Sequence, residues 1–485
     1  MPLPTPANRP SSLSPTSSSC AGRGSCSGLS SPRGDMPVEI WDKVKDHPCY
    51  SEEAHHYFAR MHVAVAPSCN IQCNYCNRKY DCSNESRPGV VSEKLTPEQA
   101  MRKVVAVAAK LPQLSVLGIA GPGDALANPR RTFATFSLVR EALPHLKLCL
   151  STNGLALPDH VETIKAFGID HVTVTISMVD PAIGEKIYPW ISYDGRRWTG
   201  REASQILHER QMQGLEMLVA AGILVKVNSV LIPGINDAHI DEINRVVKAK
   251  GAFLHNVMPL ISDPAHGTHF GLTGQRGPTP VELHAVQERL EGGARLMRHC
   301  RQCRADAVGL LSQDLSGDFS LDKLPEAPRF EPAAREMYLR FVEQERDDRA
   351  RAVAEIQEEA VLSPQREAVL VAVATKGGGR INQHFGHARE FQIYRVEDAK
   401  VAFQGIRRVD NYCQGGFGED DILPATIEAL KDVSAVFVAR VGRGPRAALE
   451  KAGLEVVENP VHDYIERALL SWWSAADTAI QAAAG

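Results

Sequence analysis

The feature that most limits the fold of this chain is an alternation of β-rich and helical stretches between about His62 and Leu260. Helical segments such as 96–110, which opens on Thr96 and Pro97, separate six runs rich in β-branched and aliphatic residues. Strands that alternate with helices favour parallel βα units, and six units predict an open, partial (β/α)6 barrel of the TIM type. The six expected strands are 62–66, 115–120, 147–151, 171–176, 223–231 and 252–257.

Polar and glycine-containing motifs follow five of the six expected strands. Cys69 follows the first strand, and the motif 121–124 (Gly-Pro-Gly-Asp) follows the second. Further motifs end the next three strands at 149–154, 177–180 and 231–237. Glycine and asparagine are ordinary turn residues, so one such motif would indicate only a loop. Five in succession predict a binding site at the face of the sheet where barrels of this type keep their chemistry.

Three cysteines, Cys69, Cys73 and Cys76, stand in one loop after the first expected strand. A cube-shaped [4Fe-4S] cluster has four irons, which cysteine thiolates normally hold. Three thiolates leave one iron open, and an open iron can bind the amino and carboxylate groups of S-adenosylmethionine (SAM). Tyr75, just before the last cysteine, completes a pattern that resembles the radical SAM signature. A zinc knuckle or a set of buried structural thiols is the alternative.

The resemblance to the radical SAM core extends to the motifs at the strand ends. It implies that Gly121, Gly123 and Asp124 stand where the superfamily has a Gly-Gly-Glu-like run that takes the SAM amino group. Pro122 and Asp124 depart from the common form, which gives backbone carbonyls a larger part in that contact. The residues expected at the methionyl carboxylate and the ribose are Thr175, Ser177 and Asn228. Strand-edge polar residues without a ligand are the alternative for these three.

The chain has eleven cysteines, too many for chance and too scattered for a disulfide scaffold. Cys20 and Cys26 lie in a Ser/Pro/Gly-rich head whose composition cannot bury a core, and Cys413 lies far downstream. With one histidine, the other eight would make nine ligands, enough for three clusters with three protein ligands each. Packed core thiols are the alternative for any of them. The eight are Cys49, Cys69, Cys73, Cys76, Cys82, Cys149, Cys300 and Cys303.

Three sequence blocks surround the cysteine loop, at 47–57, 60–67 and 77–92. They resemble the NifB family, radical SAM maturases of the nitrogenase iron–molybdenum cofactor, and the resemblance runs from about Val38 to the C terminus. It implies SAM and three [4Fe-4S] clusters, two of which are substrates. The implied activity uses a SAM methyl group and a 5′-deoxyadenosyl radical. It fuses the two substrate clusters, with a carbide and an added sulfur, into an eight-iron core.

The same resemblance implies three protein ligands for each substrate cluster. The two sets are Cys49, His55 and Cys149 for one cluster and Cys82, Cys300 and Cys303 for the other. Three ligands rather than four leave irons exposed for fusion and release. His56, adjacent and equally able to bind iron, competes with His55. A zinc half-site, or part of the auxiliary region of a peptide-modifying radical SAM enzyme, is the alternative for the last two cysteines.

Other polar residues near these ligands have less specific roles. Glu85 and Arg87, just after Cys82, are candidates for proton handling or for positioning their loop, with ordinary surface charges as the alternative. We expect His62 to support the first strand and His47 to cap or pack.

A second β-rich pattern follows a charged segment. The segment 331–359, rich in Arg and Glu, predicts a solvated linker helix, and β-rich runs follow at 368–375, 390–396 and 433–439. They resemble the small NifX-type domain, an α/β fold related to ribonuclease H, which implies a role in holding or delivering the cofactor core. The candidates for contact with a cluster there are His384, His387 and Cys413. Packing of the two histidines in a Gly-rich turn is the alternative.

We therefore expect an α/β chain with four regions. These are a disordered head (1–37), the radical SAM core with the auxiliary cluster ligands (38–320), a charged linker helix (321–364) and a NifX-like cofactor-binding domain (365–485).

The composition narrows the location and the partners. The head lacks the apolar segment of a signal peptide, and no stretch approaches the roughly 20 apolar residues of a membrane span. We expect a cytoplasmic protein without a membrane partner. A net charge of −4 gives no reason to expect nucleic acid as a partner.

The resemblance to the NifB family implies protein partners. They are iron–sulfur cluster donors, an electron-donating ferredoxin, and carrier and scaffold proteins of nitrogenase assembly. Two other classes stay open: a cluster carrier without radical chemistry, and a radical SAM enzyme that acts on a peptide or small molecule.

Overall fold

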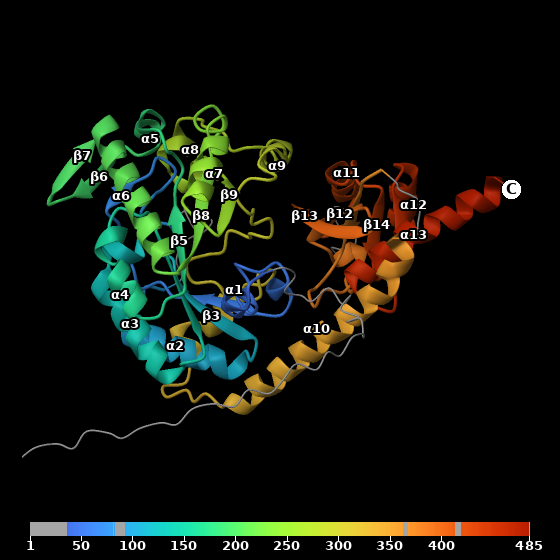
Figure 1. The fold of residues 1–485 in the computed structure, drawn as a ribbon, viewed down its shortest axis with the longest axis horizontal. Helices are drawn as coiled ribbons and strands as arrows, with labels where there is room; N and C mark the ends of the chain where they lie inside the picture. The colour runs from blue at the N-terminus through green and yellow to red at the C-terminus, as the bar shows by residue number, and fades with distance from the viewer. Residues whose placement is uncertain (1–35, 81, 83–92, 362–366, 413–418, 485) are drawn as a thin grey trace, which may run out of the picture.

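The computed structural model describes residues 36–80, 82, 93–361, 367–412 and 419–484. They form a larger body, a smaller C-terminal body (the tail domain, residues 367–484) and a long helix that runs beneath both (Figure 1).

The larger body is built on a curled sheet of seven strands in the order β10-β1-β3-β4-β5-β8-β9. Six of them run parallel, which confirms the predicted partial barrel: β1 (Ala59–His62), β3 (Leu114–Ile119), β4 (Lys147–Thr152), β5 (His171–Thr175), β8 (Leu224–Leu231) and β9 (Leu254–Pro259). The seventh, β10 (Val308–Gly309), pairs antiparallel with β1 and was not expected. The first strand was predicted at 62–66 but lies at 59–62 and shares only His62 with the prediction, because the charged Arg60 lies buried within it.

Helices cover the outer face of this sheet (Figure 1). The predicted helix after the first strand is α2 (Pro97–Lys110), which Thr96 and Gln99 cap reciprocally in a capping box. The others of the larger body are α1 (Val38–Val44), α3 (Pro129–Ala142), α4 (Val161–Ala166), α5 (Pro181–Ile187), α6 (Gly200–Ala220), α7 (Ile240–Ala249), α8 (His269–Leu272) and α9 (Pro280–Arg289).

Successive residues of the barrel strands face opposite sides, as the two-residue period of a strand requires. On β4, β5 and β8, Leu150, Val172 and Val225 are fully buried in the apolar core beneath the helices. Their neighbours Ser151 and Lys226 line a cavity inside the barrel. The sheet is therefore apolar outside and polar inside, and its inner face is available for chemistry.

A short three-stranded sheet, β2-β6-β7, lies beside the barrel. The strand β2 (Ile71–Gln72) pairs antiparallel with β6 (Trp190–Tyr193), which forms a hairpin with β7 (Arg196–Thr199). The hairpin was missed, although the Asp194-Gly195 turn, with both residues at positive φ, is a typical hairpin signal.

The tail domain is a mixed α/β unit with the sheet order β13-β12-β11-β14-β15. Its strands are β11 (Val369–Val373), β12 (Glu390–Glu397), β13 (Lys400–Arg408), β14 (Ala435–Val438) and β15 (Glu455–Glu458). One face of the sheet packs on α13 (Ile465–Ala484), and the other on α11 (Glu419–Ala429) and α12 (Arg443–Lys451). Three of the five strands were predicted; β13 and β15 were not.

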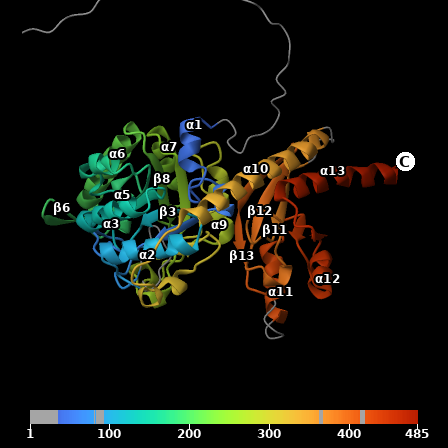
Figure 2. The ribbon, with the colours of Figure 1, turned by 90° about the horizontal axis from the view of Figure 1, so that it is seen from below.

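The long helix α10 (Pro332–Val361) crosses from the barrel to the tail domain (Figure 2). The expectation of a solvated linker helix is wrong for one of its faces. Val342 is buried against Tyr57 and Phe58, and Arg346 forms an ion pair with Glu53. Near the other end of the helix, Ile356 packs on the core of the tail domain. The helix therefore binds both bodies through its own side chains.

None of the described helices is both long and apolar enough to cross a lipid bilayer.

Candidate functional site

The cysteine loop is held by side-chain hydrogen bonds of Gln72 and Arg78 and by the pairing of β2 with β6. The side-chain amide of Gln72 donates to the carbonyl oxygens of Cys73 and Cys76 at 2.9 Å each. Arg78 donates to the carbonyl of Ile71 at 2.7 Å. These contacts wrap the three thiols into one compact turn at the carboxyl face of the barrel.

The surroundings of these thiols are apolar and largely closed. Cys73 is buried, and Cys69 and Cys76 are partly buried in a cluster with Tyr75, which is fully buried. Burial, with the nearby Asp124 carboxylate, raises the pKa of Cys69 to about 12. Such a thiol becomes a thiolate when a metal centre replaces its proton, so the donor set fits an iron–sulfur cluster.

Among the described residues, no group of three or more His, Cys, Asp or Glu side chains converges on a point that one metal ion could occupy. An iron–sulfur cube has a different requirement, because each thiolate binds a separate iron.

The glycine motif lies directly against the start of the cysteine loop. The amide of Gly123 donates to the carbonyl of Ala66 at 2.6 Å, and that of Asp124 to the carbonyl of Ser68 at 2.8 Å. A Cβ atom on Gly123 would lie 2.1 Å from the Ser68 oxygen, so no larger residue fits there without movement. At Gly121, a Cβ would lie 3.8 Å from that of Cys82. The structure thus brings the two predicted motifs together.

Asp124 has a bracing role that the sequence did not indicate. One carboxylate oxygen accepts from the amides of Leu126 and Ala127 at 2.9 and 3.0 Å. The other accepts from the Asn153 amide at 2.6 Å and the Thr152 hydroxyl at 3.0 Å. Burial nevertheless raises the pKa of this carboxyl group. Asp124 therefore joins the ends of β3 and β4 with its carboxylate already occupied by protein donors.

The three strand-end residues predicted at SAM are all buried. The Thr175 carbonyl accepts from Gln211 at 2.8 Å, and the Ser177 hydroxyl accepts from the amide of Val230 at 3.1 Å. The Asn228 side-chain oxygen accepts from Asn256 at 2.9 Å. Only Asn228 of the three lines the inner cavity.

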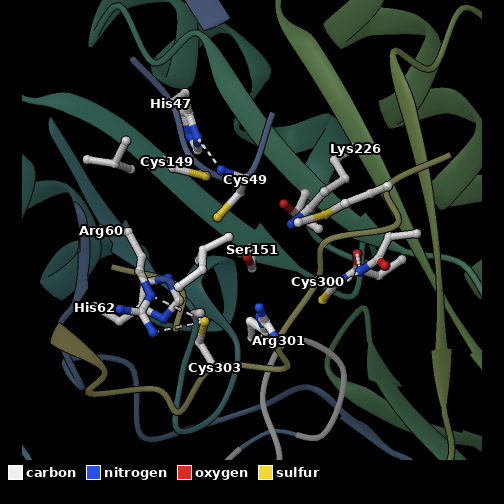
Figure 3. A pocket seen from close by; sticks show the side chains of 18 residues that line it. His47, Cys49, Arg60, His62, Cys149, Ser151, Lys226, Cys300, Arg301 and Cys303 are labelled. Atoms are coloured by element: carbon white, nitrogen blue, oxygen red, sulfur yellow. Dashed lines mark hydrogen bonds between the residues drawn. The ribbon is translucent and has the colours of Figure 1, made fainter. Parts of the chain in front are cut away.

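A cavity inside the barrel brings four predicted ligands together (Figure 3). They are Cys49, Cys149, Cys300 and Cys303, which come from the N-terminal segment, from β4 and from the loop before β10. Burial raises the pKa of Cys49 to about 12 and also raises that of Cys300, while the charge of Lys226 opposes both shifts.

Cationic side chains share this cavity with the thiols. The guanidinium of Arg60 lies 3.2 Å (Nε) and 3.1 Å (Nη2) from the sulfur of Cys303, as the dashed lines in Figure 3 mark. Lys226 and Arg301 line the same space. Three cations beside four thiols suit an anionic occupant, because burying a charge is costly unless it is paired.

Some predicted residues lie elsewhere. His55 does not line the cavity. Its ring stacks on that of His299, with the ring centroids 5.1 Å apart, and its centroid lies 4.0 Å from that of His56. Its Nδ1 contacts the carbonyl of Glu52. Cys82 lies near the glycine motif rather than in the cavity lining. Glu85, Arg87 and Cys413 lie outside the described residues.

Two other histidines, which we expected only to support or pack, line the cavity instead. His47 accepts from the amide of Cys49 at 3.2 Å, and its Nε2 is buried with no hydrogen-bond partner among the described residues. His62 contacts the carbonyl of Arg304 at 3.1 Å through Nδ1. The signal for His62 was its place on the polar inner side of the first strand, and the signal for His47 was its position two residues before Cys49, a predicted ligand.

In the tail domain, His384 and His387 lie in one short turn with ring centroids 5.1 Å apart. The Nδ1 atom of His384 accepts from the amide of Gly386 at 3.0 Å, so this side chain caps the turn.

Comparison with known families matches the two bodies separately. The family model described as the Radical SAM superfamily covers residues 63–247, and the one described as dinitrogenase iron-molybdenum cofactor covers residues 367–475.

Whole-length relatives extend these matches. The chain is 61% identical over 459 residues to the FeMo cofactor biosynthesis protein NifB of Herbaspirillum seropedicae, covering 94% of this chain and 87% of that protein. To the protein of the same name from Rhodobacter capsulatus it is 62% identical over 438 residues, 90% and 97% of the two chains. To that of Azotobacter vinelandii it is 54% identical over 459 residues, 92% and 91% of the two chains.

Among solved structures, methylornithine synthase is 16% identical and superposes with a TM-score of 0.32, covering 53% of this chain and 68% of that one.

Proposed function

Because the chain belongs to the NifB family of radical SAM FeMo cofactor biosynthesis proteins, we propose that it builds the eight-iron precursor of the nitrogenase cofactor. It fuses two [4Fe-4S] substrate clusters with a carbide derived from SAM and with an added sulfur. Three parts of this proposal go beyond membership of the family: the methyl transfer, the carbide and the number of three clusters.

The lining of the barrel cavity is the observation that carries the proposal. Four thiols from three separate segments line one cavity together with three cationic side chains. A single SAM-binding cluster on the loop 69–76 leaves these four thiols without a role. Substrate clusters beside that loop account for both the thiols and the cations.

We assign the resident cluster to the cysteine loop and the substrate clusters to the cavity. Cys69, Cys73 and Cys76 hold the resident cluster, and the backbone of 121–123 and the ends of β5 and β8 meet SAM. When bound, SAM and this cluster supply a methyl group and a 5′-deoxyadenosyl radical. Cys49 and Cys149 hold one substrate cluster, and Cys82, Cys300 and Cys303 hold the other. For the histidine of the first set, sequence resemblance favours His55, whereas proximity to the cavity favours His47.

The remaining polar residues place these groups rather than react. Asp124 ties the glycine motif to the end of β4, and Gln72 holds the cysteine turn closed. Arg60 and Lys226 offset negative charge within the cavity. Bringing the substrates next to the radical source is the main task of the protein, since the cofactor supplies the reactive species.

Supporting proteins and the tail domain complete the proposal. Iron–sulfur cluster donors, a ferredoxin, and carrier and scaffold proteins supply substrates and electrons and receive the product. The tail domain holds or delivers the product core. A shortened chain that ends near Leu362 and still matures and delivers the cofactor like the full chain would exclude that role.

Anaerobic iron counting with EPR tests the proposal. The full chain should hold about twelve irons, and the Cys69→Ala/Cys73→Ala/Cys76→Ala variant about eight. About four irons falling to none would leave a radical SAM enzyme without substrate clusters. Detection of S-adenosylhomocysteine together with 5′-deoxyadenosine separates the enzyme from a cluster carrier, which would form neither.

A further inference from the structure

The tail domain contacts the barrel at the segment between two cavity cysteines. Arg301, which stands between Cys300 and Cys303, forms a two-point ion pair with Glu390 on β12. One of the two contacts, from Nη2 to Oε1, measures 2.6 Å. The Arg301 side chain is only 7% exposed, so water screens this pair weakly.

A second residue of the tail domain grips the backbone of the same arginine. Arg408 donates from Nη2 to the Arg301 carbonyl at 3.0 Å. Glu390 and Arg408 stand opposite each other on the paired strands β12 and β13. One cross-strand pair therefore holds both the side chain and the main chain of Arg301.

Arg301 also faces the cavity. It belongs to the cavity lining, and its Nε is buried without a hydrogen-bond partner among the described residues. Its Nη atoms bind the tail domain, so the cavity lining and the tail domain share this one side chain. The arginine thus connects the tail domain to the space between the thiols.

We propose that Glu390 and Arg408 are positioning residues, through which the tail domain holds the Cys300–Cys303 loop in the geometry that binds a substrate cluster. The inference rests on the proposed function only for the identity of that occupant. The tail domain is then part of the cluster site from the start of the reaction, in addition to any later role in holding product.

Hydrogen–deuterium exchange on the full chain tests this directly. In anaerobically purified Glu390→Gln protein, peptides that cover 297–309 should exchange about tenfold faster than in wild type, because a charged hydrogen bond to the loop is lost. Glu390→Asp, which keeps the charge, should restore part of the protection. The matched control is Asp432→Asn, which removes the charge from the two-point Arg407–Asp432 pair, whose two partners both belong to the tail domain.

A second measurement follows iron release to a ferrous chelator. Glu390→Gln and Arg408→Ala should each release about a third of the bound iron faster, with the rest unchanged, because one of three clusters is affected. Wild-type exchange and wild-type release in both variants would overturn the inference. A uniform loss of protection across the chain would also overturn it, since that indicates general unfolding. Failure of the proposed function reads differently: wild type would then hold only about four irons, while exchange of the loop still reports its contact with the tail domain.

Discussion

Arg60 and Cys303 form a direct hydrogen-bonded pair across the inside of the barrel, with two guanidinium nitrogens at 3.2 and 3.1 Å from the sulfur. The same guanidinium donates from Nη1 to the carbonyl of Gly309 at 2.5 Å and to that of Leu310 at 3.1 Å. One buried cation therefore fixes both the Cys303 thiol and the antiparallel edge strand β10.

Replacing Arg60 should separate its two roles. Arg60→Met should lower the free energy of unfolding by about 2 kcal/mol or more, since buried charged hydrogen bonds are lost. It should also remove the cluster that we propose at Cys303. Arg60→Lys keeps the charge without the planar fork, so it should retain part of the iron but little of the stability. Denaturant unfolding and iron counting check both effects, and a full iron content in Arg60→Met would contradict the assigned role.

The two candidate histidine ligands can be told apart by substitution. We expect His47→Ala to lose about four irons and His55→Ala to keep them, because only His47 lines the cavity. The matching spectroscopic check is the nitrogen coupling in pulsed EPR of each variant. Retention of that coupling in His47→Ala and its loss in His55→Ala would instead support the ligand predicted by resemblance.

Gly123→Ala should displace the start of the cysteine loop. Its new methyl group would lie 2.1 Å from the Ser68 carbonyl oxygen. Because that oxygen belongs to the backbone, a side-chain rotation cannot relieve the clash, and the backbone itself must move. We expect weaker SAM binding by calorimetry and an altered EPR signal of the SAM-bound cluster. Gly444→Ala, where nothing lies within 4 Å of the added atom, is the control and should behave as wild type. Unchanged SAM affinity in Gly123→Ala would count against this packing.

Acid should destabilise the barrel through His255. This side chain is fully buried between Ser229 and Asn244, and burial lowers its pKa from 6.5 to about 4. A lowered histidine pKa means that the unfolded chain binds the proton more tightly. Stability is therefore full above pH 6.5 and declines as the pH falls toward 4, by about 3 kcal/mol for this group.

Urea unfolding at several pH values checks this effect. His255→Gln should show a smaller loss of stability between pH 6.5 and pH 4 than wild type, with about one proton fewer taken up on unfolding. An unchanged slope would show that His255 is not among the groups responsible.

Five of the six barrel strands could be placed closely because each lies in a continuous run rich in β-branched and aliphatic residues that helical stretches separate from the next. The first strand was misplaced because Arg60 interrupts its apolar pattern, and its partners, Cys303 and the carbonyls near Gly309, lie far away in sequence. The hairpin 190–199 was missed although Asp194-Gly195 signals its turn, because its strands are short and partly exposed. The buried face of α10 escaped prediction because its contacts, such as Val342 with Phe58, lie far apart in sequence.

The candidate site was predictable in its residue types and less so in their grouping. The cysteine loop and the glycine motif meet as expected, because both follow neighbouring parallel strands. The gathering of Cys49 with Cys300 depends on how the N-terminal segment folds back into the barrel, which spacing does not specify. The choice between His47 and His55 has the same origin, since a loop can turn either imidazole toward a ligand.

The alternation of apolar and polar residues on the barrel strands separates folding from chemistry within each strand. Leu150 and Val225 pack under the helices, while their neighbours Ser151 and Lys226 face the cavity and contribute little to that packing. Except where an inner side chain also binds the backbone, as Arg60 does, a change on the inner side leaves the outer core intact, so its cost to folding is small. Such a barrel can exchange one inward-facing residue for another over generations while its scaffold persists, and new reactions can arise on an old fold.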